Sequence, residues 1–300
     1  MPNTLAHLGI QAVASRALVR GADLRWVFVG CVVPDLPWIA NRVLAALGPE
    51  LDTFAVRPVW IAQASLPGSL LLCGALAALA KRPSRAFALL AGNAFLHLLL
   101  DALQTKWGNG VHLLAPFSWH TWNVGWFWPE SGPTWLLTGL GAGVAVLAFV
   151  DVRRRAARGA WPGRTRWLAS AALLAAYLAF PWLVRDAVVA ADVHSLQTLA
   201  HPELRAGREA AFDRAWLEVR DDGEARLYAL GGVVVRATGA LPERSSNVSA
   251  RGRFSDAQTI VLQEVHVHGF PRAAASYAGL AVVAAVLAVG WIPRRRSSPP

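Results

Sequence analysis

The sequence predicts a mainly α-helical, polytopic membrane protein: a bundle of six or seven transmembrane helices, with a small β-barrel-like domain inserted before the last helix. Three observations support this fold class. Hydrophobic residues make up 55% of the 300 residues and charged residues only 16%, which is too apolar for a soluble enzyme of this size. Apolar stretches of membrane-spanning length recur along the chain. The one long polar stretch, 188–270, instead carries strand-like alternation.

The predicted spans follow from hydropathy and flanking charge, since one bilayer crossing takes about 20 apolar residues. Six clear candidates lie at roughly 24–47, 64–81, 84–105, 133–150, 167–187 and 273–292. Residues 3–20 are only moderately apolar. They neither begin with basic residues nor end at a small-residue cleavage site, so we expect a helix of the mature protein rather than a signal peptide.

Basic residues gather at four turns, and these turns predict the orientation. The groups are Arg16, Arg20 and Arg25; Lys81, Arg82 and Arg85; Arg153 to Arg166; and Arg294 to Arg296. The positive-inside rule places all four on the cytoplasmic side, with a cytoplasmic C-terminus. Because the runs adjoin apolar segments, the net charge of +10 indicates topology signals and contact with membrane lipids, and no nucleic-acid partner is expected. The two cysteines predict neither a disulfide nor a metal site.

Four polar groups lie within or near these apolar segments, where an ionisable residue is costly and marks a candidate functional site. At about 1.5 Å per helical residue, His7, Asp35, His97 and Asp101 lie roughly 15 to 24 Å from the nearest basic turn. They are therefore expected to converge on one layer. His97 and Asp101 share a helix face because they are four residues apart. Pro34 removes a backbone donor and predicts a local helix break beside Asp35.

Imidazole and carboxylate groups are suitable ligands for a divalent metal ion, zinc foremost. Such an ion lowers the pKa of bound water and supports hydrolysis. We therefore expect His7, Asp35, His97 and Asp101 to be metal ligands, with Asp35, His97 and Asp101 as the catalytic group. The alternative is structural: His97 and Asp101 could hydrogen-bond each other or a neighbouring helix, and Asp35 could cap the helix broken at Pro34.

The order of these motifs resembles a known family. His7, the segment Gly30 to Asp35, the His97/Asp101 pair and the segment Gly110 to Ser118 together resemble the YdjM-like family of predicted inner-membrane metal-dependent hydrolases, over roughly residues 1–150. The resemblance implies a multi-helix protein of the bacterial inner membrane with a His/Asp metal site. It carries over His7, Asp35, His97 and Asp101 as candidate ligands.

One segment departs from the family pattern. Where the family has a His-Arg-Gly-x-Thr-His-Ser-like motif, this chain reads Gln63 to Ser69 and has neither histidine. His112 and His120 in the outer loop are candidate replacements, and His120 is included among the predicted metal ligands. The same loop, 106–132, is rich in tryptophan, which favours an interfacial belt over a lid above the metal.

The polar stretch 188–270 predicts an extracytoplasmic β-rich domain between the helical domain, 1–187, and the last helix with its basic tail, 271–300. After a helical linker to Glu209, four segments alternate like strands, at 215–220, 225–230, 232–236 and 260–268. Short strands within about 60 residues favour an OB-like barrel. His266 and His268 share a strand face, an arrangement that is more often simply exposed than metal-binding.

Two functions of different class follow. The first is a membrane-bound metal-dependent hydrolase that cleaves an ester or phosphoester bond of a lipidic or membrane-associated substrate. The second is a non-enzymatic membrane protein in which a degenerate metal site stabilises the bundle and the outer β-domain binds a partner or glycan. The missing histidines favour the second, and the common depth of the four polar groups favours the first.

Overall fold

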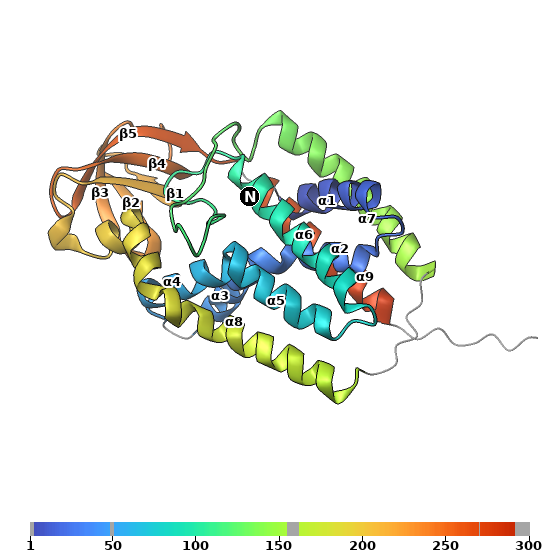
Figure 1. Ribbon diagram of the computed structural model, residues 1–300. Coiled ribbons are helices and arrows are strands. Elements are labelled where there is room, and N and C mark those ends of the chain that lie inside the picture. Colours follow the sequence, from blue (N-terminus) through green and yellow to red (C-terminus); the bar gives the residue numbers. More distant parts are fainter. Residues whose placement is uncertain (1–2, 49–50, 155–161, 270, 292–300) are drawn as a thin grey trace, which may run out of the picture.

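A computed structural model describes residues 3–48, 51–154, 162–269 and 271–291, and it places a helical bundle beside a β-barrel (Figure 1). The helices are α1 Thr4–Leu18, α2 Leu24–Val32, α3 Leu36–Ala46, α4 Thr53–Ala64, α5 Leu66–Ala78, α6 Pro83–Ala102, α7 Gly132–Arg154, α8 Arg164–Ala191 and α9 Pro271–Trp291. The strands are β1 Glu209–Val219, β2 Ala225–Tyr228, β3 Val234–Gly239, β4 Ser246–Phe254 and β5 Thr259–Val267. The short helical turns are η1 Val33–Asp35, η2 Val193–Leu199, η3 Pro202–Leu204 and η4 Leu230–Gly232.

Among the described residues, four helices are long and apolar enough to cross a membrane: Leu24–Ala46, Pro83–Ala102, Gly132–Val152 and Arg164–Ala191. The pair α4 and α5 is a fifth candidate if it forms one span, although its two parts are bent by 65°. Helix α1 and the apolar part of α9 are shorter, at 15 residues for α1 and Ala274–Gly290 for α9. The mainly helical fold with several span-length helices and a separate barrel is confirmed.

Two breaks shape the helices near the site. The break predicted at Pro34 is confirmed, because η1 separates α2 from α3 and holds Asp35. A second break lies at Ser65, which has extended backbone and accepts a hydrogen bond from the amide of Gly68, so it caps α5. The helix before it, α4, was not among the predicted spans, since Arg57 and Gln63 interrupt its apolar pattern.

Glycines let two pairs of helices approach closely. A Cβ added at Gly30 of α2 would lie 2.6 Å from the carbonyl oxygen of Leu90 in α6, so the two backbones touch there. This contact brings the end of α2, and with it Asp35, against α6. A Cβ at Gly141 of α7 would lie only 1.8 Å from the carbonyl oxygen of Leu5, so α7 is packed against the start of α1 in the same way.

The predicted basic turns meet at the end of the bundle away from the barrel (Figure 1). The Arg85 guanidinium donates to the carbonyls of Arg20 and Gly21, at 2.7 and 3.1 Å. Arg16 pairs with Asp151 at 3.1 Å. The end of α1, the turn before α2, the start of α6 and the end of α7 are therefore neighbours. The fourth predicted group, Arg294 to Arg296, lies outside the described residues.

The five strands form a closed barrel in the order β1-β2-β3-β5-β4, with β3 and β5 parallel and the other pairs antiparallel. Alternate residues fill its core, as predicted for β1, β2 and β5. Strand β4 was missed, because its exposed arginines and its glycine read as a polar turn in the sequence. Strand β1 begins at Glu209, earlier than predicted, and is bulged between Phe212 and Ala215.

Candidate functional site

The four predicted polar groups converge in the structure. His7 Nε2 lies 3.1 Å from Asp101 Oδ1, and His97 Nε2 lies 3.5 Å from Asp35 Oδ1 and 3.9 Å from Asp101 Oδ2. All four side chains are buried. They come from the start of α1, from η1 and from the end of α6, so the predicted convergence is confirmed, whereas their role as metal ligands stays a prediction.

The two histidine rings are held parallel. Their centroids lie 4.1 Å apart with an interplanar angle of 14°. On the outer side of His7, the Gln11 amide nitrogen lies 3.4 Å from Nδ1, while the amide oxygen of Gln11 is buried without a hydrogen-bond partner. Rotating that amide by half a turn would let its oxygen accept from Nδ1–H and leave Nε2 free to bind an ion, which is the support a metal-ligating histidine requires.

Lys106 is a site residue that the sequence analysis missed. Its ammonium Nζ lies 2.9 Å from Asp101 Oδ2, and both side chains are 7% exposed. Burial acts to lower the pKa of Lys106, but its pairing with Asp101 outweighs this and raises the pKa above the usual value. The buried Asp101 therefore has a cationic partner from the chain itself. The long side chain reaches back from just beyond the end of α6.

A cavity of about 770 Å³ opens beside this cluster, between the bundle, the loop after α6 and the barrel. Asp35, His97, Asp101 and Lys106 line one side of it. His120 also lines the cavity, but its side chain is exposed. Among the residues that the structure describes, His120 does not belong to any cluster of three or more possible metal ligands.

His112, the second loop histidine, lines the same cavity and is fixed by the backbone. Its ring Nδ1 donates to the carbonyl of Trp119 at 2.8 Å. Burial lowers the pKa of this histidine. His112 is therefore a neutral, immobilised wall residue.

The loop between α6 and α7 divides its aromatic residues between two environments. Phe117 and Trp126 are 97% and 72% exposed, which fits the predicted interfacial belt. Trp107 and Trp128 instead pack edge to face, with centroids 5.0 Å apart, and Trp128 stacks on His266 of β5. The loop therefore both borders the cavity and contacts the barrel.

The segment Gln63 to Ser69 lies next to the site. Gln63, Ser65 and Ser69 are buried at the junction of α4 and α5, and both helices contact the turn that holds Asp35. Polar side chains that do not usually bind zinc thus occupy this position.

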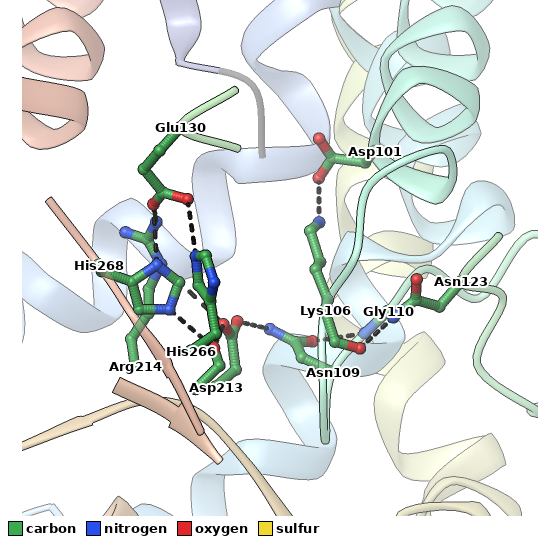
Figure 2. A network of polar contacts seen from close by, with 11 residues as sticks. Asp101, Lys106, Asn109, Gly110, Asn123, Glu130, Asp213, Arg214, His266 and His268 are labelled. Carbon is green, nitrogen blue, oxygen red and sulfur yellow. Dashed lines mark hydrogen bonds and ion pairs between the residues drawn. The ribbon is translucent and has the colours of Figure 1, made fainter. Parts of the chain in front are cut away.

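Two sets of polar contacts, linked only by the backbone of the loop after α6, lie between the cluster and the barrel (Figure 2). Asn123 donates to the carbonyl of Lys106, and Gly110 N–H donates to Asn109 Oδ1 at 2.8 Å. The Asn109 amide donates to Asp213 of β1 at 3.0 Å. Gly108 packs on the same strand, since a Cβ there would lie 2.1 Å from the carbonyl oxygen of Ala211. These contacts join the loop to the barrel.

Compared with known proteins, the chain matches no family model, no curated protein and no solved structure. The support for the candidate site therefore comes from the positions of its own residues.

Proposed function

We propose that this protein is a membrane-embedded, metal-dependent hydrolase with an ion held by His7, His97 and Asp101. One observation carries the proposal: a nitrogen of each histidine and a carboxylate oxygen of Asp101 all lie within 4.8 Å of one another, in a buried group beside a cavity. Two imidazoles and one carboxylate, with a further position left open, are the ligand set of many catalytic zinc sites. The YdjM-like resemblance predicts the same residues.

The surrounding side chains suit a bound cation. Asp35 lies 3.5 Å from His97 Nε2 and adds a second carboxylate to the cluster. Gln11 can accept a hydrogen bond from the outer nitrogen of His7, as described above. When bound, a divalent ion would supply a Lewis acid and a water molecule of lowered pKa. The chain would supply Lys106, whose ammonium borders the cavity and can neutralise an anionic substrate group.

The proposed substrate is an ester or phosphoester of a lipidic or membrane-associated molecule. The site lies at the end of α6, a helix apolar enough to span a membrane, and the loop that borders the cavity exposes large aromatic side chains. In the proposed arrangement the basic turns face the cytoplasm of a bacterial cell, and the barrel, which we infer to be OB-like, lies on the opposite side. The aromatic loop then contacts the outer leaflet and covers the cavity.

The test is zinc-dependent hydrolysis by the full-length protein in detergent, with para-nitrophenyl esters and phosphodiesters in mixed micelles as probes. We expect chelation to abolish turnover, and His97→Gln or Asp101→Asn to lower it on the order of 100-fold or more. His201→Gln and Asp221→Asn, at exposed positions of the outer domain, are matched controls and should keep activity. Loss of activity in the controls, or activity that survives in His97→Gln, would contradict the assignment.

A second candidate function is non-enzymatic, and the Lys106 contact favours it. With the ammonium at 2.9 Å and His7 at 3.1 Å, Asp101 is already neutralised and hydrogen-bonded without an ion. In that case the network stabilises the bundle and the outer barrel binds a partner or glycan. Asp101→Asn would then destabilise the protein while its metal content, negligible in the wild type, stayed unchanged.

A further inference from the structure

A second group of potential metal ligands lies outside the site described above. Glu130 stands just before α7, His266 lies on β5, and His268 directly follows this strand. One ligand atom from each residue lies within 4.8 Å of the other two. Figure 2 shows the two rings and the carboxylate turned toward one another. The residues belong to segments more than a hundred positions apart, so the fold brings them together.

We propose that Glu130, His266 and His268 bind a second divalent metal ion, of the zinc class, that fastens the loop preceding α7 to the last strand of the barrel. This site is independent of the proposed hydrolase centre. Two imidazoles and a carboxylate are ligands that zinc prefers. A structural rather than catalytic role follows from the position of the site, because its ligands join two segments and none of them lines the main cavity.

Two buried atoms without a hydrogen-bond partner among the described residues face the position proposed for the ion. Glu130 Oε2 and His266 Nε2 are both buried, and neither has a hydrogen-bond partner. They lie 3.6 Å apart, too far for a hydrogen bond and suitable for two ligands of one ion, since Zn–O and Zn–N bonds are about 2.0 to 2.2 Å long. Buried polar atoms in folded proteins are normally satisfied. A cation between them would satisfy both.

The third ligand is already supported on its far side. His268 Nδ1 lies 2.8 Å from Glu130 Oε1, while its Nε2 lies 2.8 Å from the Ser249 hydroxyl. Ser249 in turn donates to Asp213 Oδ1 at 3.3 Å. With Nδ1 on the ion, Nε2–H would donate to the serine, whose own proton goes to the carboxylate. Metal-ligating histidines are typically held through the second ring nitrogen in this way.

The remaining neighbours that the structure describes make no hydrogen bond to Glu130 Oε2 or His266 Nε2. Trp128 stacks on His266 with centroids 3.6 Å apart and an angle of 4°, so the ring is oriented by stacking rather than by hydrogen bonds. Arg214 donates to Glu130 Oε1 at 3.3 Å and leaves Oε2 free. Arg214 has a φ of 61°, an unusual value for a residue with a side chain, at the bulge of β1. The bulge thus directs its guanidinium to one side of the carboxylate.

The test is a titration of chelator-stripped, full-length protein in detergent with Co²⁺, whose visible absorption reports binding. We expect two ions per wild-type chain, one in His266→Gln/His268→Gln and one in His97→Gln/Asp101→Asn. The control His201→Gln alters another histidine of the outer domain and should bind as the wild type does. If the His266→Gln/His268→Gln variant binds as many ions as the wild type, the proposal is wrong.

The same titration separates this proposal from the proposed function. A wild-type protein that binds one ion, lost in His266→Gln/His268→Gln but kept in His97→Gln/Asp101→Asn, supports the second site and overturns the first. The reverse pattern overturns the second site alone. Should the double variant fail to fold, Glu130→Gln decides: we expect at least a tenfold weaker Co²⁺ affinity at one site, and unchanged affinity contradicts the proposal.

Discussion

Replacing Lys106 with methionine tests how the buried Asp101 is neutralised. The substitution keeps the length of the side chain but removes the ammonium that lies 2.9 Å from Asp101 Oδ2. Removing one member of a buried ion pair typically costs about 3–5 kcal/mol, because the remaining charge is left uncompensated. His7 still contacts the other carboxylate oxygen at 3.1 Å, so the lower end of this range is expected. For a chain of 300 residues, with an unfolding entropy of about 0.6 kcal/mol/K, a loss of about 3 kcal/mol corresponds to a melting temperature lower by roughly 5 °C in chelator.

Zinc should reverse this loss if the site binds metal. In the wild type the ammonium competes with an ion for Asp101, whereas in Lys106→Met the ion replaces it as the counter-charge. Zinc at 100 times its Kd stabilises a binding protein by about 2.7 kcal/mol. Because the substitution removes the competitor, we expect a lower Kd and a larger zinc-induced rise in melting temperature for Lys106→Met than for the wild type.

The assay can use the two cysteines of the chain. Cys31 and Cys73 are both free and buried, so a thiol-reactive fluorogenic dye labels them only on unfolding. Lys81→Met is the matched control, since Lys81 is the only other lysine of the sequence and is exposed. The reasoning is refuted if Lys106→Met melts in chelator like the control, or if zinc raises both melting temperatures equally.

Three further predictions concern packing and charge. Gly141→Ala should cost about 1–3 kcal/mol because its Cβ would lie 1.8 Å from an α1 carbonyl, whereas Gly143→Ala, with open space, should be tolerated in the same dye assay. Gly108→Ala should make the barrel easier to release by limited proteolysis than Gly223→Ala does; both have positive φ, but only the first meets a backbone atom, at 2.1 Å. Burial alone would raise the pKa of Glu130, but its histidine and arginine partners lower it to about 2. The stability that Glu130 contributes is therefore present above about pH 4.5 and lost as the pH falls toward 2. In chelator, Glu130→Gln should therefore make the melting temperature fall less steeply with pH over this range.

Much of the helical fold was predictable because hydropathy and basic turns act locally. The span at 84–105 corresponds closely to α6, and the break at Pro34 follows from its missing backbone donor. The common depth of His7 and Asp101 needed only the helical rise and the positions of the arginines. Helix α4 was not predicted as a span, because its polar residues lower the mean hydropathy of the segment although they face the interior.

The parts of the site that were missed depend on contacts between distant segments. Lys106 follows an apolar helix and reads as an ordinary loop residue until the chain turn directs it back to Asp101. Glu130 is an isolated acid in the sequence, and nothing local links it to His266, although the spacing of His266 and His268 was visible in the sequence. Strand β4 was hidden by its exposed arginines, which pair with acids on neighbouring strands instead of forming a turn.

The most direct test of the proposed hydrolase centre is an anomalous difference map at the zinc edge, from crystals of the full-length protein grown with zinc. The proposed function predicts a peak among His7, His97 and Asp101, with ligand distances of about 2.0 to 2.2 Å. Lys106 would then be displaced from the oxygen it now contacts at 2.9 Å. A map without a peak at this cluster, with the Lys106–Asp101 pair intact, would contradict the hydrolase assignment and favour a structural network.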